Sequence, residues 1–249
     1  MKTTTISFTL LFFSLLSATI LNAEEIGKQL NFDVNPRWYN KGNTKVFGEV
    51  GVRKEFINND WTRYHVKPSV AYALGERWTA LAGLGVTYTD NEELYSIPIE
   101  DRVELAPYQG ISYGHDLFRQ WAMHYYLRLE ERFDFNTQTK ESLDSLRLRF
   151  RIRAIYKFNA YEKGRYFRLL FGWEAFHTVE GTAGQINEKS RATLGLERSF
   201  SKNQMLKGEV TWERQHVDFF NNEYSDIYLS ISYYPSWGAV ESNQVKEEE

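Results

Sequence analysis

In two segments of the chain, residues 125–133 and 146–154, charged residues recur at every second position and the others are mostly apolar or aromatic. In the second segment arginines occupy every other position and alternate with leucine, phenylalanine and isoleucine. Successive side chains of a β-strand point to opposite faces, so the arginines share one face and the apolar side chains share the other. Such a strand either packs its apolar face on a soluble core or turns that face to lipid, with the arginines lining a barrel interior.

The same alternation predicts about ten strands, and twelve is the other number that the pattern allows. The strands are expected near residues 45–56, 61–74, 78–89, 101–113, 118–135, 143–156, 166–177, 191–200, 205–215 and 226–234. Residues 24–44 are either a periplasmic lead-in or an extra strand around residues 31–39.

The connections between these strands alternate in length along most of the chain. Short turns are expected at residues 74–77, 114–116, 159–165 and 201–204, and longer polar loops at residues 89–101, 136–142, 178–190 and 217–225. Outer-membrane barrels have short periplasmic turns, longer outer loops, an even strand number and both termini in the periplasm. We therefore predict an all-β, antiparallel up-and-down transmembrane β-barrel over residues 45–235.

Aromatic residues make up 16% of the chain and are expected at both ends of the strands. One group lies beside the short turns (Trp78, Trp121, Phe167, Phe200), and a second lies at the loop ends (Phe56, Tyr88, Phe133, Phe135, Phe176). Two such rings are typical of the girdles at the two membrane interfaces. The alternative is the aromatic core of a soluble barrel. The mean hydropathy of -0.52 does not exclude the membrane, because barrel strands alternate their lipid-facing residues with polar ones.

The two ends of the chain carry export and assembly signals. Residues 1–23 are predicted to be a signal peptide cleaved after Ala23, and the alternative is a retained helical anchor. The chain has no cysteine. The strand at residues 226–234 is typical of the closing strand that barrel-assembly machinery recognises, and residues 236–249 are expected to be an acidic, disordered tail. The predicted location is the outer membrane of a Gram-negative envelope, in contact with its lipid.

Four short segments carry a resemblance to a known family: residues 103–109, 126–133, 147–153 and 173–176. They resemble a family of bacterial outer-membrane barrels known as domain of unknown function 2490. Its pattern Arg-x-Arg-x-Glu-x-Arg is matched by Arg128, Glu130 and Arg132, while Tyr126 replaces the first arginine. The resemblance implies a barrel and no established activity. A looser similarity, in character rather than motif, is to the small oligogalacturonate- and sialate-specific porins, which have twelve strands and arginine-lined lumens.

If the apolar faces meet lipid, the charged faces line a lumen. The candidate lumen or solute-binding residues are Arg128, Glu130, Arg132, Arg147, Arg149, Arg151, Arg153, Arg168 and Glu174. One hypothesis is a narrow channel for small anionic solutes, because guanidinium groups bind carboxylates with bidentate geometry. The alternative is a plugged structural or surface barrel, in which carboxylates and arginines pair across strands. The net charge of -3 indicates no nucleic-acid partner.

A second alternative is an outer-membrane hydrolase with an Asp/His site at the extracellular rim. His216 and Asp218 lie at a predicted loop mouth, with Asp60, Asp90 and Asp226 as candidates to join them. His124 is predicted to face the lumen, and His65, His115 and His177 are scattered without the spacing of metal ligands. We therefore assign no catalytic residue, no metal site and no cofactor from the sequence.

Overall fold

The computed structural model describes residues 27–55, 61–92, 100–118, 120–158, 166–181, 188–201, 203–217 and 222–237. Their regular structure is β-strand: β1 (Gly27–Val34), β2 (Arg37–Lys41), β3 (Thr44–Phe47), β4 (Val50–Glu55), β5 (Thr62–Val66), β6 (Ser69–Ala73), β7 (Trp78–Glu92), β8 (Glu100–Phe118), β9 (Trp121–Asn136), β10 (Ser142–Lys157), β11 (Tyr166–Gly181), β12 (Glu188–Ser201), β13 (Gln204–Val217) and β14 (Asn222–Pro235). Across these ranges we find no helix with the length and hydropathy needed to cross a membrane. The predicted signal peptide and most of the predicted tail lie outside them.

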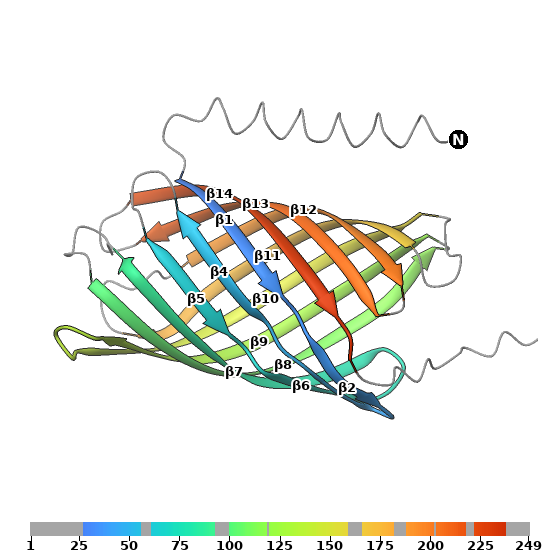
Figure 1. Cartoon of the computed structure of the whole chain (residues 1–249), viewed down its shortest axis with the longest axis horizontal. Helices are drawn as coiled ribbons and strands as arrows, with labels where there is room; N and C mark the ends of the chain where they lie inside the picture. The colour runs from blue at the N-terminus through green and yellow to red at the C-terminus, as the bar shows by residue number, and fades with distance from the viewer. Residues whose placement is uncertain are drawn as a thin grey trace, which may run out of the picture.

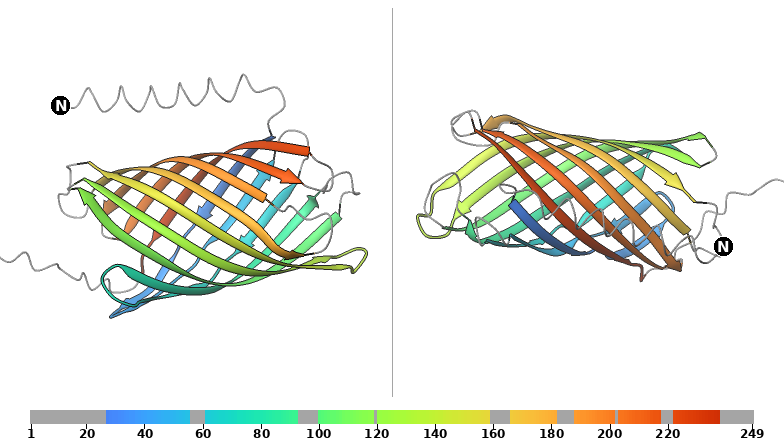
Figure 2. Two further views of the ribbon diagram at one scale, coloured as in Figure 1. Left: turned by 180° about the vertical axis from the view of Figure 1, so that it is seen from behind. Right: turned by 90° about the horizontal axis from the view of Figure 1, so that it is seen from above.

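The strands form one sheet that closes on itself (Figures 1 and 2). From β7 to β14 each strand pairs with the next one in antiparallel fashion. The ring is completed by β5, which pairs with β7, then by β4 and β1, and β1 pairs with β14. The result is an 11-stranded barrel, which confirms the predicted fold class and approximately its strand number.

On one side of the barrel, three pairs of short strands that follow each other along the chain are each separated by a gap of two residues. β1 is followed by β2, β3 by β4, and β5 by β6, and two of the three gaps contain a proline, Pro36 and Pro68. Proline has no backbone N–H and so cannot donate to the sheet. Backbone hydrogen bonds bridge the gaps: Lys67 N donates to Glu49 O at 2.7 Å, and Gly48 N donates to Pro36 O at 2.9 Å. The wall is therefore irregular here but continuous.

The extra strand changes how the barrel closes. Residues 27–41 form β1 and β2, and β1 runs parallel to β14, from Gly27 opposite Asp226 to Val34 opposite Tyr233. The start of β1 and the end of β14 therefore lie at opposite ends of the barrel. The expectation of an even strand number with both strand ends on one side was wrong, because an odd ring of alternating strands must close with one parallel pair.

One predicted turn is also placed differently by the structure. The turn expected at residues 114–116 lies inside β8, where Gly114 still pairs with His124 of β9. β8 continues to Phe118 and β9 begins at Trp121, and these two residues pair with each other, so the two strands extend beyond the predicted turn. A glycine was read as a turn signal, but in a strand glycine is also tolerated where another side chain approaches closely. Here an added Cβ would lie 3.2 Å from the His124 ring.

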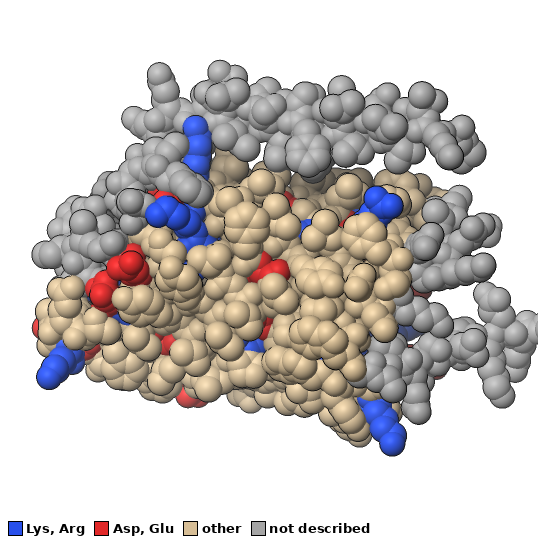
Figure 3. Space-filling view, viewed as in Figure 1, with Lys and Arg blue, Asp and Glu red and all other residues tan. Residues whose placement is uncertain are grey.

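The outer surface of the barrel is largely apolar. The face shown in Figure 3 is mainly uncharged, and most of its visible Lys and Arg side chains lie toward the barrel ends. Exposed large apolar side chains occur around the wall, among them Phe32, Val34, Tyr64, Val66, Val70, Tyr72, Leu84, Val86, Ile111, Leu127, Phe171, Trp173 and Trp212. A contiguous apolar surface of this extent is rare on a soluble monomer and fits contact with lipid.

Outward aromatic side chains gather near the two strand ends. At one end Trp78 contacts Tyr113 with ring centroids 4.7 Å apart, and Trp121 contacts Tyr156 at 5.1 Å. Toward the other end Tyr64 stacks on Tyr88 at 6.4 Å. Phe176 was wrongly assigned to this outer set: it is buried inside the barrel, among arginines. Glu174 faces the lumen, and Phe176, two positions later in the same strand, must lie on the same face.

Candidate functional site in the barrel lumen

The inner face of the barrel carries the nine predicted lumen residues: Arg128, Glu130, Arg132, Arg147, Arg149, Arg151, Arg153, Arg168 and Glu174. Cross-strand register brings them together, because directly opposed residues share a face. Arg147 lies opposite Glu130, and Arg151 lies opposite Tyr126 on one side and Glu174 on the other. The charged positions that alternate along β9, β10 and β11 are therefore neighbours on the inner face of the barrel.

Charged side chains from β9 to β13 form one continuous chain of ion pairs, which we call the ion-pair belt. Its members are Arg128, Glu130, Arg147, Arg149, Glu174, Arg191, Glu213 and Lys189. Glu130 pairs with Arg128 and Arg147 and lies 3.9 Å from Arg149. Arg149 pairs in turn with Glu174.

The second half of the belt continues through residues that the sequence did not single out. Arg191 lies 3.7 Å from Glu174 and also pairs with Glu213, which is contacted by Lys189 as well. Glu130 is only 2% exposed, so its charge depends on its arginine partners. Removing one partner of such a buried pair leaves an uncompensated charge and is strongly destabilising. The belt therefore ties five consecutive strands together from the inside.

Three more of the predicted arginines have carboxylate partners outside the belt. Arg132 pairs with Glu104. Arg153 lies 3.4 Å from Glu209, and Arg168 lies 3.2 Å from Glu197. Acids on other strands therefore balance most of the lumen arginines: Glu104, Glu197, Glu209 and Glu213.

Arg151 differs from the other inward-facing arginines of β10 in having no ion pair within the described part of the chain. Among the residues that the structure describes, no carboxylate oxygen lies within 4.0 Å of it, and its guanidinium lies over the Tyr126 ring at 4.9 Å. Arg53 of β4 has the same environment: within the described chain it has no ion pair, and it lies over the Tyr228 ring at 4.8 Å. Stacking on an aromatic face stabilises a guanidinium without using up its hydrogen-bond donors.

Phe176 provides an aromatic surface for the belt. The guanidinium groups of Arg149 and Arg191 lie 5.0 Å and 4.7 Å from its ring centre, and that of Arg147 lies 5.3 Å away. Each of the three guanidinium groups is attracted to this ring, which stabilises their positions in the lumen.

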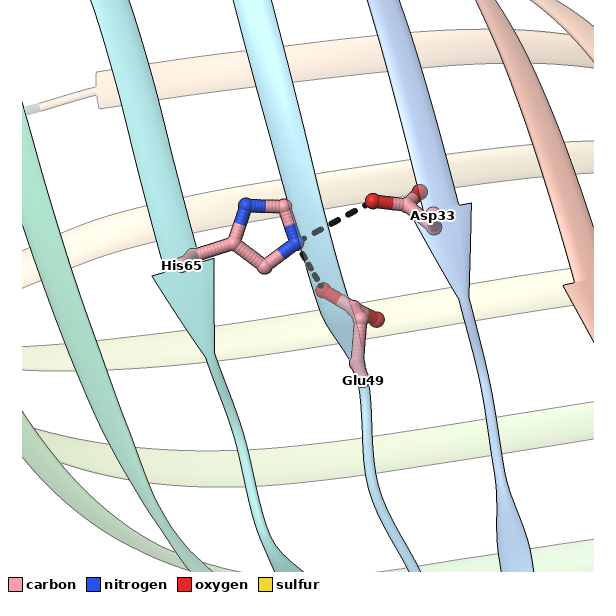
Figure 4. A group of neighbouring side chains, drawn as sticks. All are labelled: Asp33, Glu49 and His65. Atoms are coloured by element: carbon pink, nitrogen blue, oxygen red, sulfur yellow. Dashed lines mark ion pairs between the residues drawn. The ribbon is translucent and has the colours of Figure 1, made fainter.

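A separate cluster on the opposite part of the wall brings together Asp33, Glu49 and His65 (Figure 4). His65 Nε2 lies 3.1 Å from Asp33 Oδ1 and 3.1 Å from Glu49 Oε1. The three residues come from β1, from the gap between β3 and β4, and from β5. The sequence analysis missed this group because its members are far apart along the chain, and only the strand register makes them neighbours.

The remaining histidines do not form a comparable group in the described part of the chain. His124 faces the lumen opposite Arg153, and His115 lies on the outside, stacked on Tyr125. The hydrolase alternative is not tested, since Asp60, Asp218 and the side chain of His216 lie outside what the structure describes.

The chain is similar to one protein-family model and to solved structures of an outer-membrane channel and a porin. A protein-family model described as "Protein of unknown function (DUF2490)" matches residues 21–226. No curated protein matches the chain. The outer membrane channel DcaP of Acinetobacter baumannii is 11% identical with a TM-score of 0.38, and the match covers 78% of this chain and 58% of that chain. The NanC porin is 11% identical with a TM-score of 0.36, and the match covers 74% of this chain and 86% of that chain.

Proposed function

We propose that this chain, which belongs to the DUF2490 family, is an outer-membrane channel for small anionic solutes. The apolar outer wall and its aromatic ends support placement in a bilayer, since lipid-facing apolar residues alternating with a polar interior are typical of membrane barrels. The signal peptide expected over residues 1–23 fits export to the outer membrane.

The exposed fractions of the inward side chains support a lumen that holds water. Arg168 is 29% exposed and Lys67 is 33% exposed, although both point into the barrel. A lumen filled by its own side chains would bury these groups as completely as Glu130. An 11-stranded ring is also wider than an eight-stranded barrel, whose interior is filled by its side chains.

The observation that carries the proposed solute class is the environment of Arg151. Its guanidinium lies over the Tyr126 ring and forms no ion pair with a carboxylate within the described residues. Arg53 presents a second guanidinium of this kind on β4. A planar guanidinium with unused donors binds a carboxylate in bidentate fashion, so the two arginines offer binding points for an organic acid or an acidic sugar.

The ion-pair belt favours a second candidate function, a structural or surface barrel without transport. The belt and the further pairs account for most of the lumen arginines, as a plug of paired charges would. On that reading Arg151 and Arg53 are packing residues and no solute passes.

Bilayer recording of the refolded chain separates the two candidates. In a planar bilayer with a potassium chloride gradient, the channel should conduct, and its reversal potential should show a preference for chloride. Glucuronate added to one side should reduce the chloride current by binding at the lumen arginines. Folded, inserted protein that carries no current would reject the channel and favour the structural barrel.

A further inference from the structure

The Asp33–Glu49–His65 cluster lies where the barrel wall is interrupted. Asp33 is the last but one residue of β1, Glu49 stands in the gap before β4, and His65 is near the end of β5 (Figure 4). Gly51 of β4 lies between the other two strands, opposite Asp33 on one side and His65 on the other. Irregular positions in a sheet are frequent beside functional sites, because they re-aim side chains.

Two of the three atoms at the centre of the cluster belong to buried side chains and lack hydrogen-bond partners within the described chain. The side chains of His65 and Asp33 are 6% and 10% exposed. Within the described chain, neither His65 Nε2 nor Asp33 Oδ1 makes a hydrogen bond. A lone pair on Nε2 and two carboxylate oxygens at 3.1 Å repel one another, and the Lys67 ammonium relieves this at Glu49 Oε1 alone, from 2.6 Å.

A metal ion suits this arrangement better than a proton does. A proton on Nε2 lies in the ring plane and points in one direction, whereas the two oxygens lie on different segments of the chain at 3.1 Å and neither forms a well-aligned hydrogen bond with it. Tetrahedral zinc with bonds of about 2.0–2.1 Å sets its ligand atoms roughly 3.3 Å apart. The three atoms here lie within 4.8 Å of one another, and two of the separations are 3.1 Å.

The surroundings hold the ligands in place and leave room for an ion. Asn31 Nδ2 donates to Asp33 Oδ2 at 2.7 Å, so one carboxylate oxygen is fixed while Oδ1 points into the cluster. Such outer contacts are typical supports of metal ligands. An added Cβ at Gly51 would collide with Asp33 Oδ1 and would lie 2.7 Å from His65 Cε1. Glycine at this position keeps the space open.

We propose that Asp33, Glu49 and His65 bind one divalent transition-metal ion of the Zn²⁺ class. One nitrogen and two carboxylate oxygens form a donor set that zinc accepts, and three protein ligands leave a fourth position facing the lumen. The ion would join β1, the segment between β3 and β4, and β5 from the inside, next to the pair of β1 with β14 that closes the barrel. This proposal is independent of the proposed transport function.

Lys67 competes with the metal for one ligand. Its Nζ lies 2.6 Å from Glu49 Oε1, the same oxygen that faces His65. Lys67 is one-third exposed, so its ammonium can move to the second carboxylate oxygen or into the lumen when an ion binds. Removing this competing charge should therefore tighten metal binding, whereas removing a ligand should weaken it.

The test uses the tag-free, refolded barrel in detergent after treatment with a chelator. Titration with Co²⁺, followed by its visible absorption, should give one ion per chain, displaced by Zn²⁺. His65→Gln and Asp33→Asn should weaken binding by at least about tenfold. His124→Gln alters another lumen-facing histidine and should bind as the wild type does. Zinc should raise the unfolding temperature of the wild type but not of His65→Gln.

Equal Co²⁺ titrations for the wild type and His65→Gln would overturn the proposal, and so would the absence of binding by folded wild-type protein. Should His65→Gln fail to fold, Lys67→Met decides, since it keeps all three ligands. Tighter binding by Lys67→Met supports the site, and unchanged or weaker binding refutes Glu49 as a ligand.

Discussion

Neutralising Arg151 should change ion selectivity and leave the barrel stable. Arg151 forms no ion pair among the described residues, and Glu174, which lies opposite it, keeps its ion pairs with Arg149 and Arg191 in Arg151→Gln. The matched control is Arg149→Gln, two positions away on the same strand face, where the lost guanidinium is paired with Glu174. Both variants remove one positive charge from the same row of arginines, but only Arg149→Gln removes an ion-pair partner of Glu174.

The expected magnitudes follow from these contacts. A unit charge about 4 Å from a passing ion attracts an anion and repels a cation by about 1 kcal/mol each in water, so its loss should lower the anion-to-cation permeability ratio roughly thirtyfold. Arg151→Gln gives up one cation–π contact, which contributes about 0.5–1 kcal/mol at a hydrated site. Arg149→Gln should cost about 3 kcal/mol, the lower end of the range for breaking a buried pair, because Glu174 keeps Arg191 at 3.7 Å.

Reversal potentials in a salt gradient measure the selectivity, and urea unfolding in lipid vesicles measures the stability. Arg151→Lys, which keeps the charge, should retain the wild-type reversal potential. An unchanged reversal potential for Arg151→Gln would show that Arg151 does not line the ion path. A stability loss equal to that of Arg149→Gln would show that Arg151 is a structural residue, and the channel proposal would lose its main support.

Three further outcomes are expected. Unheated protein should migrate faster on a denaturing gel than boiled protein, as closed barrels do, and recovery as a soluble periplasmic monomer would contradict the membrane assignment. Leu148→Arg should impair assembly by about 2–4 kcal/mol because the charge faces lipid, whereas Ser112→Arg, which faces the lumen, should fold; equal yields would mean that the two faces are misassigned. Glu130→Gln should lower the free energy of unfolding by about 3–5 kcal/mol, since it leaves arginines unpaired at a site that is 2% exposed. Asp116→Asn, at a pair whose carboxylate is 68% exposed, should change it by less than about 1 kcal/mol.

Much of the barrel could be predicted from local patterns, and the errors occurred where a local pattern had two meanings. Period-two alternation identified the strands from β7 to β14, because each residue's face depends only on its place in its own strand. Gly114 was read as a turn, although it serves a close approach to His124 inside β8. Phe176 was read as an interface aromatic by its position near a loop, against the alternation that puts it inside.

By itself, the sequence determined that the chain forms two-faced strands with arginines on the inner face and apolar side chains on the outer. Only the tertiary structure decided which of these charges are neutralised. Glu174 reaches both Arg149 and Arg191, and Asp33 meets His65, through the register between strands and the closure of the ring. Register and closure depend on hydrogen bonds between distant segments, so no window of sequence contains them. The sequence therefore predicted which side chains share a face of a strand, but not which residues on other strands they contact.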